Sequence, residues 1–363
     1  MTQESKTIRV LHCCYSLAGG GAETQLALLS ELSKDYGIVS ATFYVEERGA
    51  VVKPGRLLFK HTRNHRWDFA IVLSVCRAIE EFEPDLIHCW LPPVVTIPAL
   101  LASKVKRKPA IISYRSAKRF HGWLSVSEFV TALFLAKGVI SNTSLHTCSP
   151  LHQRLFNWLR GVVVPNGVER FKEVLKAPRL LESNPKKMSL LFVGRILPVK
   201  NWQTLVRALL LIDESVDWKL TVCGEGPERS RFEDEVRETG LTDRVSFLGY
   251  SQKVLIEISK ADLLIMPSWS EGMPNVVLEA MSLGTATLLS DIPAHRRITE
   301  GESIDFFPAG DSEFLARKVT HLYRNPSELI SLSSKGKRIA ARYSPEMMVS
   351  SFRDYYSSIL EDR

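Results

Sequence analysis

The feature that most constrains the fold is a repeated order of apolar strand, glycine turn and helix. Residues 191–194, 220–224 and 245–249 each read as a buried strand that ends in a glycine. Strands that alternate with helices along a whole chain favour an α/β fold with parallel sheets. At 363 residues, the chain is long enough for two domains of ordinary size, each with a core of its own.

The composition along the chain suggests where the domains divide. We expect the first domain at residues 1–170 and the second at residues 188–340. The segment 172–187 between them is polar and holds two prolines, which suits a linker. Residues 344–359 read as a final helix that begins at Ser344.

Two carboxylates, Glu271 and Glu279, mark the most informative segment for function. Between them, Pro274 and Asn275 suit the start of a helix whose apolar run begins at Val276. A helix start offers free backbone N–H groups and a partial positive charge, which suit a phosphate. Carboxylates on either side could hold the hydroxyl groups of a ribose and of a sugar, which predicts a sugar-nucleotide site. Most isolated pairs at this spacing are solvated surface charges, so the neighbouring motifs decide the interpretation.

A second motif supplies positive charge. Arg195 and Lys200 flank the turn between a strand that ends at Gly194 and a helix that starts near Trp202, with Asn201 suited to cap it. Two cations at the carboxyl end of a parallel strand are well placed to hold a diphosphate. The alternative is that both are ordinary surface cations.

Three further glycine-containing turns are weaker signals. Gly19, Gly20 and Gly21 follow a strand near the amino end and precede a helix, and they permit close backbone approach to a ligand or form a flexible loop. Gly226 lies in a Gly-x-Gly turn, which many strand–helix connections need for backbone geometry alone. Leu248 lies near the end of a strand whose exposed backbone could edge a nucleotide base.

Together these motifs resemble the retaining glycosyltransferases of family 4, also called the group 1 family, which have the GT-B fold. The resemblance covers nearly the whole chain and is most specific in its C-terminal half. It rests on Gly19–Glu23, Val164–Val168, the turn from Gly194 to Asn201, Gly224–Pro227 and Glu271–Gly284. It implies an α/β architecture of two Rossmann-like domains whose parallel sheets face a central cleft. The N-terminal domain, joined by the final helix 344–359, would bind the acceptor, and the C-terminal domain would hold the nucleotide-sugar.

The resemblance also implies roles for individual residues. Arg195 and Lys200 would neutralise the diphosphate, and Glu271 would orient the donor sugar, as the catalytic residues. Glu279 would bind the ribose hydroxyls. No carboxylate can be assigned as a covalent nucleophile, so retention by front-side displacement is expected. The donor-binding set comprises Gly20, Gly21, Gly194, Gly226, Leu248, Gly272, Met273, Pro274, Asn275, Val276 and Glu279.

The acceptor side departs from the family pattern. His88 matches the family's strand that ends in histidine, but Trp90 stands where many members have a second histidine. Arg115 occupies the place of another histidine, as a permanent cation that can hold a phosphate but cannot act as a base. His121 could supply the missing imidazole or be structural. These three residues, His88, Arg115 and His121, are the expected acceptor-side residues.

Charge and aromatic residues gather in one part of the first domain. The formal net charge of +7 favours an anionic partner. Residues 104–119 hold seven basic side chains and no acid, and several large apolar side chains between 120 and 134 follow them. This pattern indicates docking on an anionic membrane face or, equally, a solvated face beside a core helix. The basic residues match no nucleic-acid motif, so no nucleic-acid partner is expected.

Other classes of protein find little support. The first residues show no apolar signal region, and no apolar run is long enough to span a membrane. The six cysteines lack metal-site spacing and read as buried thiols of a reducing compartment. With no Asp-x-Asp motif, neither a metal nor another cofactor is expected. We therefore expect a cytoplasmic protein that can lie on the inner face of the cytoplasmic membrane.

The expected activity is transfer of a sugar from a nucleotide-sugar to a glycan or a polyprenyl-diphosphate-linked acceptor. UDP-sugar is the first choice of donor and GDP-sugar the second. The resemblance implies a role in bacterial cell-surface polysaccharide biosynthesis, that is, lipopolysaccharide, O-antigen or capsule. Two alternatives stay open, a non-catalytic GT-B subunit that binds a partner enzyme and a GT-B sugar-nucleotide epimerase.

Overall fold

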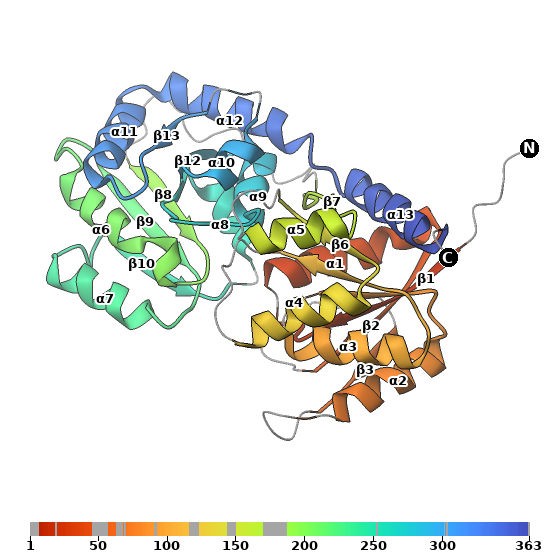
Figure 1. Ribbon diagram of the computed structural model, residues 1–363. Helices are drawn as coiled ribbons and strands as arrows, with labels where there is room; N and C mark the ends of the chain where they lie inside the picture. Colours follow the sequence, from red (N-terminus) through yellow and green to blue (C-terminus); the bar gives the residue numbers. More distant parts are fainter. Residues whose placement is uncertain are drawn as a thin grey trace, which may run out of the picture. The chain divides into compact units, whose positions relative to one another are not determined.

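The computed structural model describes residues 7–18, 20–45, 57–62, 68, 70–90, 93–115, 123–143, 150–169, 187–251, 253–300, 302 and 304–361. The chain forms two compact units, which we treat separately (Figure 1). The first comprises Met1–Gly167 with Pro345–Arg363, and the second comprises Val168–Ser344. The expected linker, residues 172–187, lies outside the described residues except for its last position.

The first unit is built on a seven-stranded sheet with the order β3-β2-β1-β4-β5-β6-β7, in which every neighbouring pair is parallel. Parallel strands need a crossover between them, and helices supply most of these connections. The strands are β1 (Ile8–Cys14), β2 (Ile38–Tyr44), β3 (Leu57–Lys60), β4 (Leu86–Trp90), β5 (Ala110–Tyr114), β6 (Gly138–Ser141) and β7 (Val162–Val163). The helices are α1 (Gly21–Leu32), η1 (Ser33–Tyr36), α2 (Ala70–Phe82), α3 (Pro93–Val105), α4 (Trp123–Leu135), α5 (Pro150–Trp158) and α13 (Pro345–Glu361).

The central strands of this sheet are buried on both faces, because successive side chains point to opposite sides and helices cover each side. Along β1, Leu11 and Cys13 join an apolar cluster with α2, α3, α4 and α5. Val10 and Cys14 join the opposite cluster, which includes side chains of α1 and α13. The final helix α13, which runs from Pro345 to Glu361, therefore completes the core of the first unit although it follows the second in sequence.

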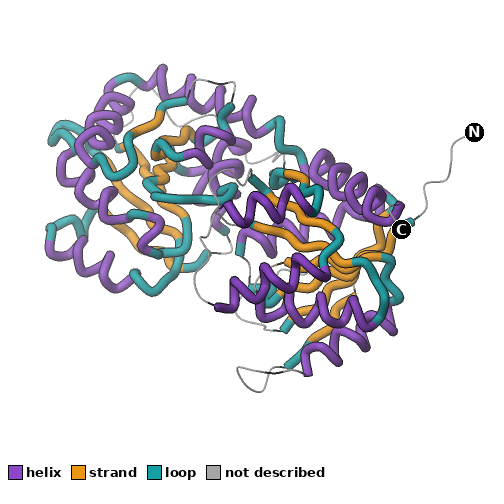
Figure 2. The backbone as a smooth tube through the Cα atoms, in the orientation of Figure 1, coloured by secondary structure: helices purple, strands orange, loops and turns teal. Residues whose placement is uncertain are grey.

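The second unit has a six-stranded parallel sheet with the order β10-β9-β8-β11-β12-β13. Figure 2 shows strands in orange and helices in purple in each unit. Its strands are β8 (Met188–Val193), β9 (Trp218–Cys223), β10 (Val245–Gly249), β11 (Leu263–Met266), β12 (Ala286–Ser290) and β13 (Phe306–Phe307). Its helices are η4 (Pro198–Lys200), α6 (Trp202–Leu211), α7 (Arg229–Glu238), α8 (Val254–Lys260), α9 (Asn275–Leu283), α10 (Pro293–Ile298), α11 (Ser312–Arg324) and α12 (Pro326–Ala340).

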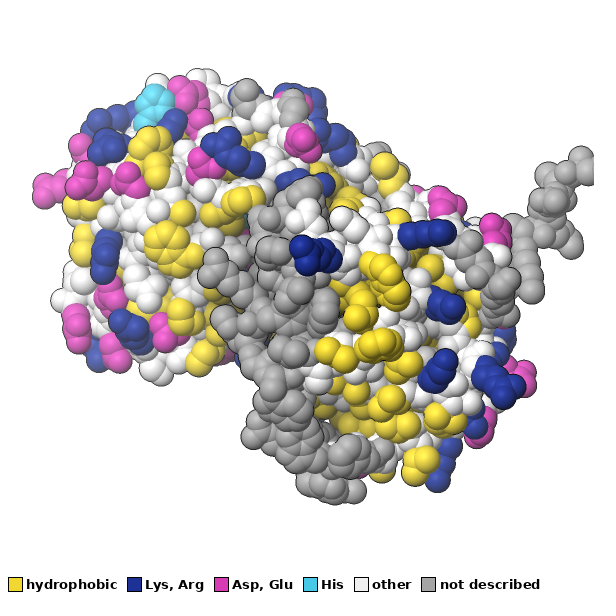
Figure 3. Space-filling view, in the orientation of Figure 1, with side chains coloured by type: hydrophobic (Ala, Val, Ile, Leu, Met, Phe, Trp, Pro, Cys, Tyr) yellow, Lys and Arg dark blue, Asp and Glu magenta, His cyan; other side chains and the backbone are white. Residues whose placement is uncertain are grey.

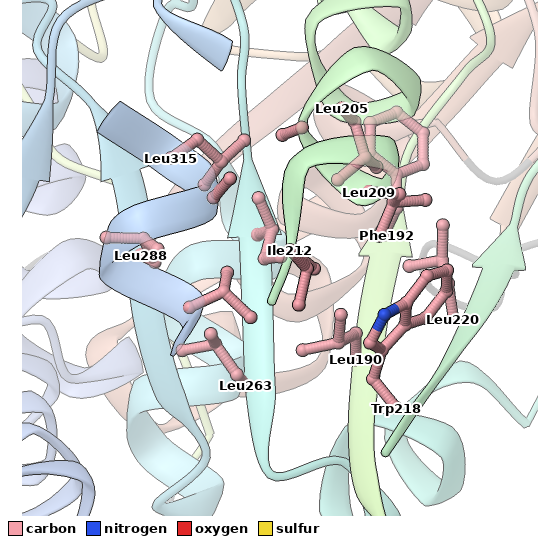
Figure 4. Packing of buried hydrophobic residues seen from close by; sticks show 14 of the residues in the cluster. Leu190, Phe192, Leu205, Leu209, Ile212, Trp218, Leu220, Leu263, Leu288 and Leu315 are labelled. Atoms are coloured by element: carbon pink, nitrogen blue, oxygen red, sulfur yellow. The ribbon is translucent and has the colours of Figure 1, made fainter. Parts of the chain in front are cut away.

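One core of the second unit lies between the sheet and helices α6, α7 and α11 (Figure 4). Leu190 and Phe192 of β8 meet Leu205 and Leu209 of α6 in this layer. On the opposite face, Leu191 joins a second cluster with side chains of α8, α9 and α12. The central strands are thus apolar on both faces, as expected for a parallel sheet covered by helices. Positions for polar chemistry remain at the strand ends.

The expected α/β architecture of two Rossmann-like domains with parallel sheets is confirmed. In both sheets the direction in which successive strands are added reverses at the first strand. Strand β1 lies between β2 and β4 in one sheet, and β8 lies between β9 and β11 in the other. In such sheets, ligands bind beyond the carboxyl ends of the strands near this point. Within the described part of the chain, no helix combines the length and apolar character needed to cross a membrane.

Candidate functional site

The carboxyl ends of β8, β9 and β10 are held together through glycines. The Gly194 N–H donates to the carbonyl of Cys223 at 3.0 Å, and the Gly224 N–H donates to the carbonyl of Gly249 at 2.7 Å. A Cβ added at Gly224 would lie 2.0 Å from the carbonyl oxygen of Gly194, and one at Gly226 would lie 2.2 Å from that of Ile196. The close contact between neighbouring turns therefore suffices to explain why Gly224 and Gly226 are glycines. A donor-binding role for Gly194 and Gly226 stays a prediction.

Two loops meet beside these turns. Asn201, which follows η4, has a left-handed backbone with φ 52°, and its side-chain amide donates to the carbonyl of Pro267 at 3.0 Å. The Trp269 N–H donates to the carbonyl of Val199 at 2.9 Å. Asn201 does occupy the position before α6, but its side chain does not cap that helix as expected. Instead it ties the β8–α6 turn to the loop that follows β11.

This connection brings Lys200 and Glu271 into direct contact. Lys200 Nζ lies 2.6 Å from Glu271 Oε1, and the two side chains are only 16% and 11% exposed. Nearly hidden from water, such an ion pair is held more firmly than a surface pair, which solvent and salt would weaken. The structure thus joins two of the three expected catalytic residues.

The third expected catalytic residue, Arg195, differs from Lys200 in its surroundings. Arg195 is exposed, and its guanidinium makes no hydrogen bond or ion pair with any described residue. It lies directly after Gly194, whereas Lys200 approaches the same glycine, since a Cβ there would lie 3.4 Å from Lys200 Cε. The turn therefore carries one cation that is paired and one that is free to meet an anion.

Helix α9 begins where the sequence suggests, but one residue earlier than a cap at Asn275 requires. Pro274 occupies the capping position and Asn275 is the first helical residue, so Asn275 does not cap the helix. Pro274, at the capping position, contributes no side-chain hydrogen bond to this end of the helix. Gly272, Met273 and Val276 are buried or half-buried around the same end. Backbone donors at a helix start suit a phosphate or the polar groups of a ligand.

Glu279 lies one turn into α9, on the same face as Asn275 and Val276. Burial, and then the nearby Glu169, raise the pKa of Glu279 to about 7. Among the residues that the structure describes, none donates a hydrogen bond to this carboxylate. Glu279 is therefore a half-buried acid whose oxygens remain available to hydroxyl donors.

A buried polar chain that sequence reasoning missed leads to Glu271. Ser268 Oγ donates to Glu271 Oε1 at 2.6 Å, and Ser290 Oγ donates to the carbonyl of Ser268 at 2.6 Å. His295 Nδ1 lies 2.8 Å from the carbonyl of Ser290. Ser268, Ser290 and His295 have no exposed surface. They could have been found by asking which polar residues lie at or beyond the carboxyl ends of apolar strands.

Leu248 and the glycines of the first unit complete the expected donor set. Leu248 on β10 is 49% exposed, as a surface that edges a base would require. Gly20 precedes α1, whose first residue is Gly21, and a Cβ at Gly20 would lie 2.5 Å from Glu23 Oε2. Gly19 lies outside the described residues. Donor contact by Gly20, Gly21 and Leu248 stays a prediction.

His88 lies in the interior of the first unit, not at its surface. Its Nδ1 lies 2.8 Å from Tyr356 Oη and its Nε2 lies 2.6 Å from Ser113 Oγ. Burial, followed by His12 and Arg115, holds the pKa of His88 well below its usual value. Since both ring nitrogens are engaged and the side chain is fully buried, this geometry argues against acceptor contact. His88 instead ties α13 to strands β4 and β5.

Arg115 retains unpaired donors in the same unit. Its Nη1 donates to Asn166 Oδ1 at 3.2 Å, and its guanidinium carbon lies 4.4 Å from the ring centroid of Trp90. Its Nε and Nη2 are buried and have no hydrogen-bond partner in the described structure. Burial lowers the pKa of Arg115 to about 10, so it remains a cation at neutral pH. His121 lies outside the described residues.

Comparison with solved structures defines the class of fold. The crystal structure of HepE from Anabaena, in complex with UDP and glucose, superposes with a TM-score of 0.78. The sequences are 17% identical, and the match covers 97% of this chain and 100% of the other. Two parallel-sheet domains arranged in this order along the chain define the GT-B fold of glycosyltransferases.

The family follows from the sequence of the second unit. Residues 175–339 match the model of the family described as glycosyl transferases group 1. The expected resemblance to the group 1 glycosyl transferases is therefore confirmed for this segment. The segment includes Arg195, Lys200, Glu271 and Glu279, whereas Gly20 and Gly21 of the expected donor set lie outside the matched segment.

Two relatives align over almost the whole chain. The lipopolysaccharide core biosynthesis glycosyltransferase LpsD of Rhizobium meliloti is 23% identical over 368 residues, which cover 96% of this chain and 98% of that protein. The phosphatidyl-myo-inositol mannosyltransferase of Mycobacterium leprae is 25% identical over 376 residues, which cover 96% of each chain. The expected class of enzyme, a glycosyltransferase, is confirmed at this level.

Proposed function

We propose that this glycosyltransferase is a retaining enzyme of family 4 that moves a sugar from UDP-sugar to a glycan or lipid-linked acceptor of the bacterial cell surface. The observation that carries the proposal is the contact between Lys200 and Glu271 beside the free Arg195 and the start of α9. This arrangement offers cations for a diphosphate and a carboxylate for hydroxyl groups within one loop cluster. The relatives named for lipopolysaccharide core and for mannosyl transfer support the choice of substrate class.

In this proposal, charge that develops on the leaving nucleotide is stabilised from two sides. Arg195 and Lys200 approach from the β8–α6 turn, and the backbone donors of α9 approach from the other loop. Preorganised cations and dipoles stabilise a leaving diphosphate without having to reorient during the reaction. Glu271 holds a hydroxyl of the donor sugar, and Glu279 accepts hydrogen bonds from the ribose.

The proposed retention of configuration rests on the contacts and positions of the two carboxylates, Glu271 and Glu279. Glu271 is engaged by Lys200 and Ser268 through Oε1, and Glu279 is on a helix whose start is assigned to the phosphates. Neither is therefore assigned as a nucleophile toward the anomeric carbon. Attack by the acceptor from the side of the leaving group then accounts for retention. The cations of the site take the role that a divalent metal has in other transferases, so we propose a metal-independent reaction.

The experiment that tests the proposed function is calorimetric titration with UDP and with GDP, in buffer that contains EDTA. We expect UDP to bind with at least about tenfold higher affinity than GDP, because UDP-sugar is the proposed donor. Incubation with UDP-sugar alone then separates the alternatives, since an epimerase would convert the donor without an acceptor. Failure to bind either nucleotide would favour the non-catalytic subunit. Binding only when a divalent metal is added would contradict metal independence.

We also propose that the first unit docks on an anionic membrane. Large apolar side chains are exposed on three successive helices, with Val105 of α3 at 67%, Phe134 of α4 at 76% and Trp158 of α5 at 63%. Figure 3 shows hydrophobic side chains gathered over the part of this unit where Figure 1 places these helices. Exposed Lys104 and Arg107 lie beside Val105. Apolar side chains beside cations suit the interface of an anionic bilayer.

Replacing Phe134 and Trp158 together with serine should weaken binding to vesicles that contain phosphatidylglycerol by roughly tenfold or more, since two exposed apolar side chains no longer enter the bilayer. Cosedimentation measures the change. Leu210→Ser is a matched control, because Leu210 is 48% exposed on α6 of the second unit and should not affect binding. Equal binding by wild type and the double variant, or binding that ignores the anionic lipid, would overturn the docking proposal.

A further inference from the structure

We propose that His295 is a positioning residue that fixes the orientation of Glu271 through Ser290 and Ser268. The inference rests on the proposed function, in which Glu271 holds a hydroxyl of the donor sugar. His295 itself touches neither substrate nor Lys200 in this assignment. It lies on α10, beyond the end of β12, and acts through three hydrogen bonds, in which each serine accepts through its backbone carbonyl and donates through its hydroxyl.

The series crosses two neighbouring strands of the sheet. It starts at His295, reaches the end of β12 at Ser290, passes to Ser268 just beyond β11 and ends at Glu271. Each contact is between 2.6 and 2.8 Å. All of its members before Glu271 are fully buried. A buried polar chain with short contacts is rigid, because no water can replace a contact that is lost.

The geometry fixes which nitrogen of His295 carries the proton. A carbonyl oxygen only accepts hydrogen bonds, so Nδ1 must be the protonated nitrogen that donates to Ser290. Burial lowers the pKa of His295, which keeps the ring neutral at physiological pH. Nε2 therefore carries a lone pair, and it has no partner among the described residues. An apolar side chain at position 295 would not bury an unsatisfied nitrogen such as Nε2, but it could not donate a hydrogen bond to the carbonyl of Ser290.

The end of the series decides how Glu271 points. Oε1 accepts hydrogen bonds from both Lys200 and Ser268, whereas Oε2 has no partner in the part of the chain that the structure describes. With Lys200 alone, the carboxylate could rotate about a single contact. The second donor, Ser268, fixes the plane of the carboxylate and leaves Oε2 available to a sugar hydroxyl. Because Ser268 is in turn held through Ser290, His295 sets the angle at which Oε2 meets the sugar.

The test compares His295→Leu with His295→Asn, since the asparagine amide can replace the Nδ1 donor and leucine cannot. The ligands are UDP and whichever of UDP-glucose, UDP-galactose and UDP-N-acetylglucosamine wild type binds best. We expect His295→Leu to lose roughly tenfold in affinity for the UDP-sugar and to keep its affinity for UDP within about twofold. His295→Asn should recover most of the loss. A merely structural role would weaken both ligands alike.

A buried residue outside the series provides the matched control. Thr285 is 5% exposed in the same unit, and its hydroxyl donates to the carbonyl of Ile258 at 2.7 Å. Thr285→Val also removes a buried hydrogen bond, so it should lower the thermal stability but leave the ratio of UDP-sugar to UDP affinity unchanged. A change of that ratio in Thr285→Val equal to that in His295→Leu would overturn the inference.

A double-mutant cycle shows whether His295 acts through Glu271. Adding His295→Leu to Glu271→Gln should reduce kcat/KM by less than about twofold, although His295→Leu alone should reduce it roughly 10-fold to 100-fold. Independent, multiplicative losses would overturn the inference. Failure of wild type to bind any UDP-sugar would overturn the proposed function and the inference with it. Wild-type binding with an unchanged affinity ratio in His295→Leu would overturn the inference alone.

Discussion

Replacing Lys200 with methionine should reduce the rate of sugar transfer by roughly 100-fold to 1,000-fold, because a preorganised cation is lost from the leaving diphosphate. The side chains of Lys200 and Glu271 are 16% and 11% exposed, so little water is available to replace the ammonium group. Methionine keeps the length and apolar stem of lysine, which isolates the effect of the charge. Initial rates at saturating acceptor, together with calorimetric affinity for UDP, measure the change.

The effect on stability should be far smaller than the effect on turnover. Glu271 keeps the hydrogen bond from Ser268 in the variant, so the carboxylate is not left without a partner. We expect a loss of about 1–2 kcal/mol in the free energy of unfolding, less than for a fully buried pair. A fall in activity that parallels unfolding would show that Lys200 is structural.

Two comparison variants locate the loss in the donor site. Lys260 is a lysine of the same unit whose side chain is 60% exposed in its ion pair with Glu257, so Lys260→Met should retain full turnover. Arg115→Met should raise the KM for an anionic acceptor without changing the affinity for UDP, if its unpaired nitrogens hold that acceptor. Undiminished turnover in Lys200→Met would refute the catalytic assignment of Lys200, whatever the comparison variants show.

Sequence periodicity predicts this fold well because parallel sheets leave a strong pattern. The central strands of both units are apolar on both faces, and a glycine ends or directly follows three strands of the second unit. What the pattern cannot supply is a contact between distant segments. The final helix is recognisable from its own residues, but its place beside α1 in the first unit depends on packing of Val349 and Phe352 into that core.

The candidate site divides in the same way. Lys200 and Glu271 are recognisable because charged residues beside strand–helix turns are unusual in otherwise apolar surroundings. Ser268, Ser290 and His295 are common residue types, and only the register of β11 beside β12 places them in one chain of hydrogen bonds. Conversely, His88 resembles a functional histidine in sequence. Only the structure shows that it is buried and that Ser113 and Tyr356 engage both of its ring nitrogens.

Glu279→Gln should make the ligand-free protein more stable at pH 8 and make it bind UDP more weakly. Burial and Glu169 raise the pKa of Glu279 from 4.5 to about 7, so the fold favours the protonated acid. A raised acid pKa means that stability is lost as pH rises from about 4.5 through about 7, because the unfolded chain releases the proton more readily. Glutamine removes this loss, on the order of 2 kcal/mol at pH 8 for a half-buried group.

Glu279 lowers the stability of the ligand-free protein, but it should strengthen the binding of UDP. The ionised carboxylate accepts two hydrogen bonds from ribose hydroxyls, and a glutamine oxygen accepts them more weakly, so UDP affinity should fall roughly 10-fold to 100-fold. For the same reason, wild-type affinity for UDP should decline as pH falls below about 7, whereas that of Glu279→Gln should be flatter.

Urea unfolding at pH 5 and pH 8, with calorimetry of UDP over the same range, tests both halves of this expectation. Glu169→Gln is the matched control, because it removes the neighbouring charge and should shift the pH profile of UDP binding downward without abolishing binding. A Glu279→Gln variant that binds UDP like wild type would remove Glu279 from the donor site. Equal stability of the two proteins at pH 8 would show that the ionised carboxylate does not destabilise the ligand-free protein. The expectation that Glu279 lowers stability while it strengthens UDP binding would then be wrong.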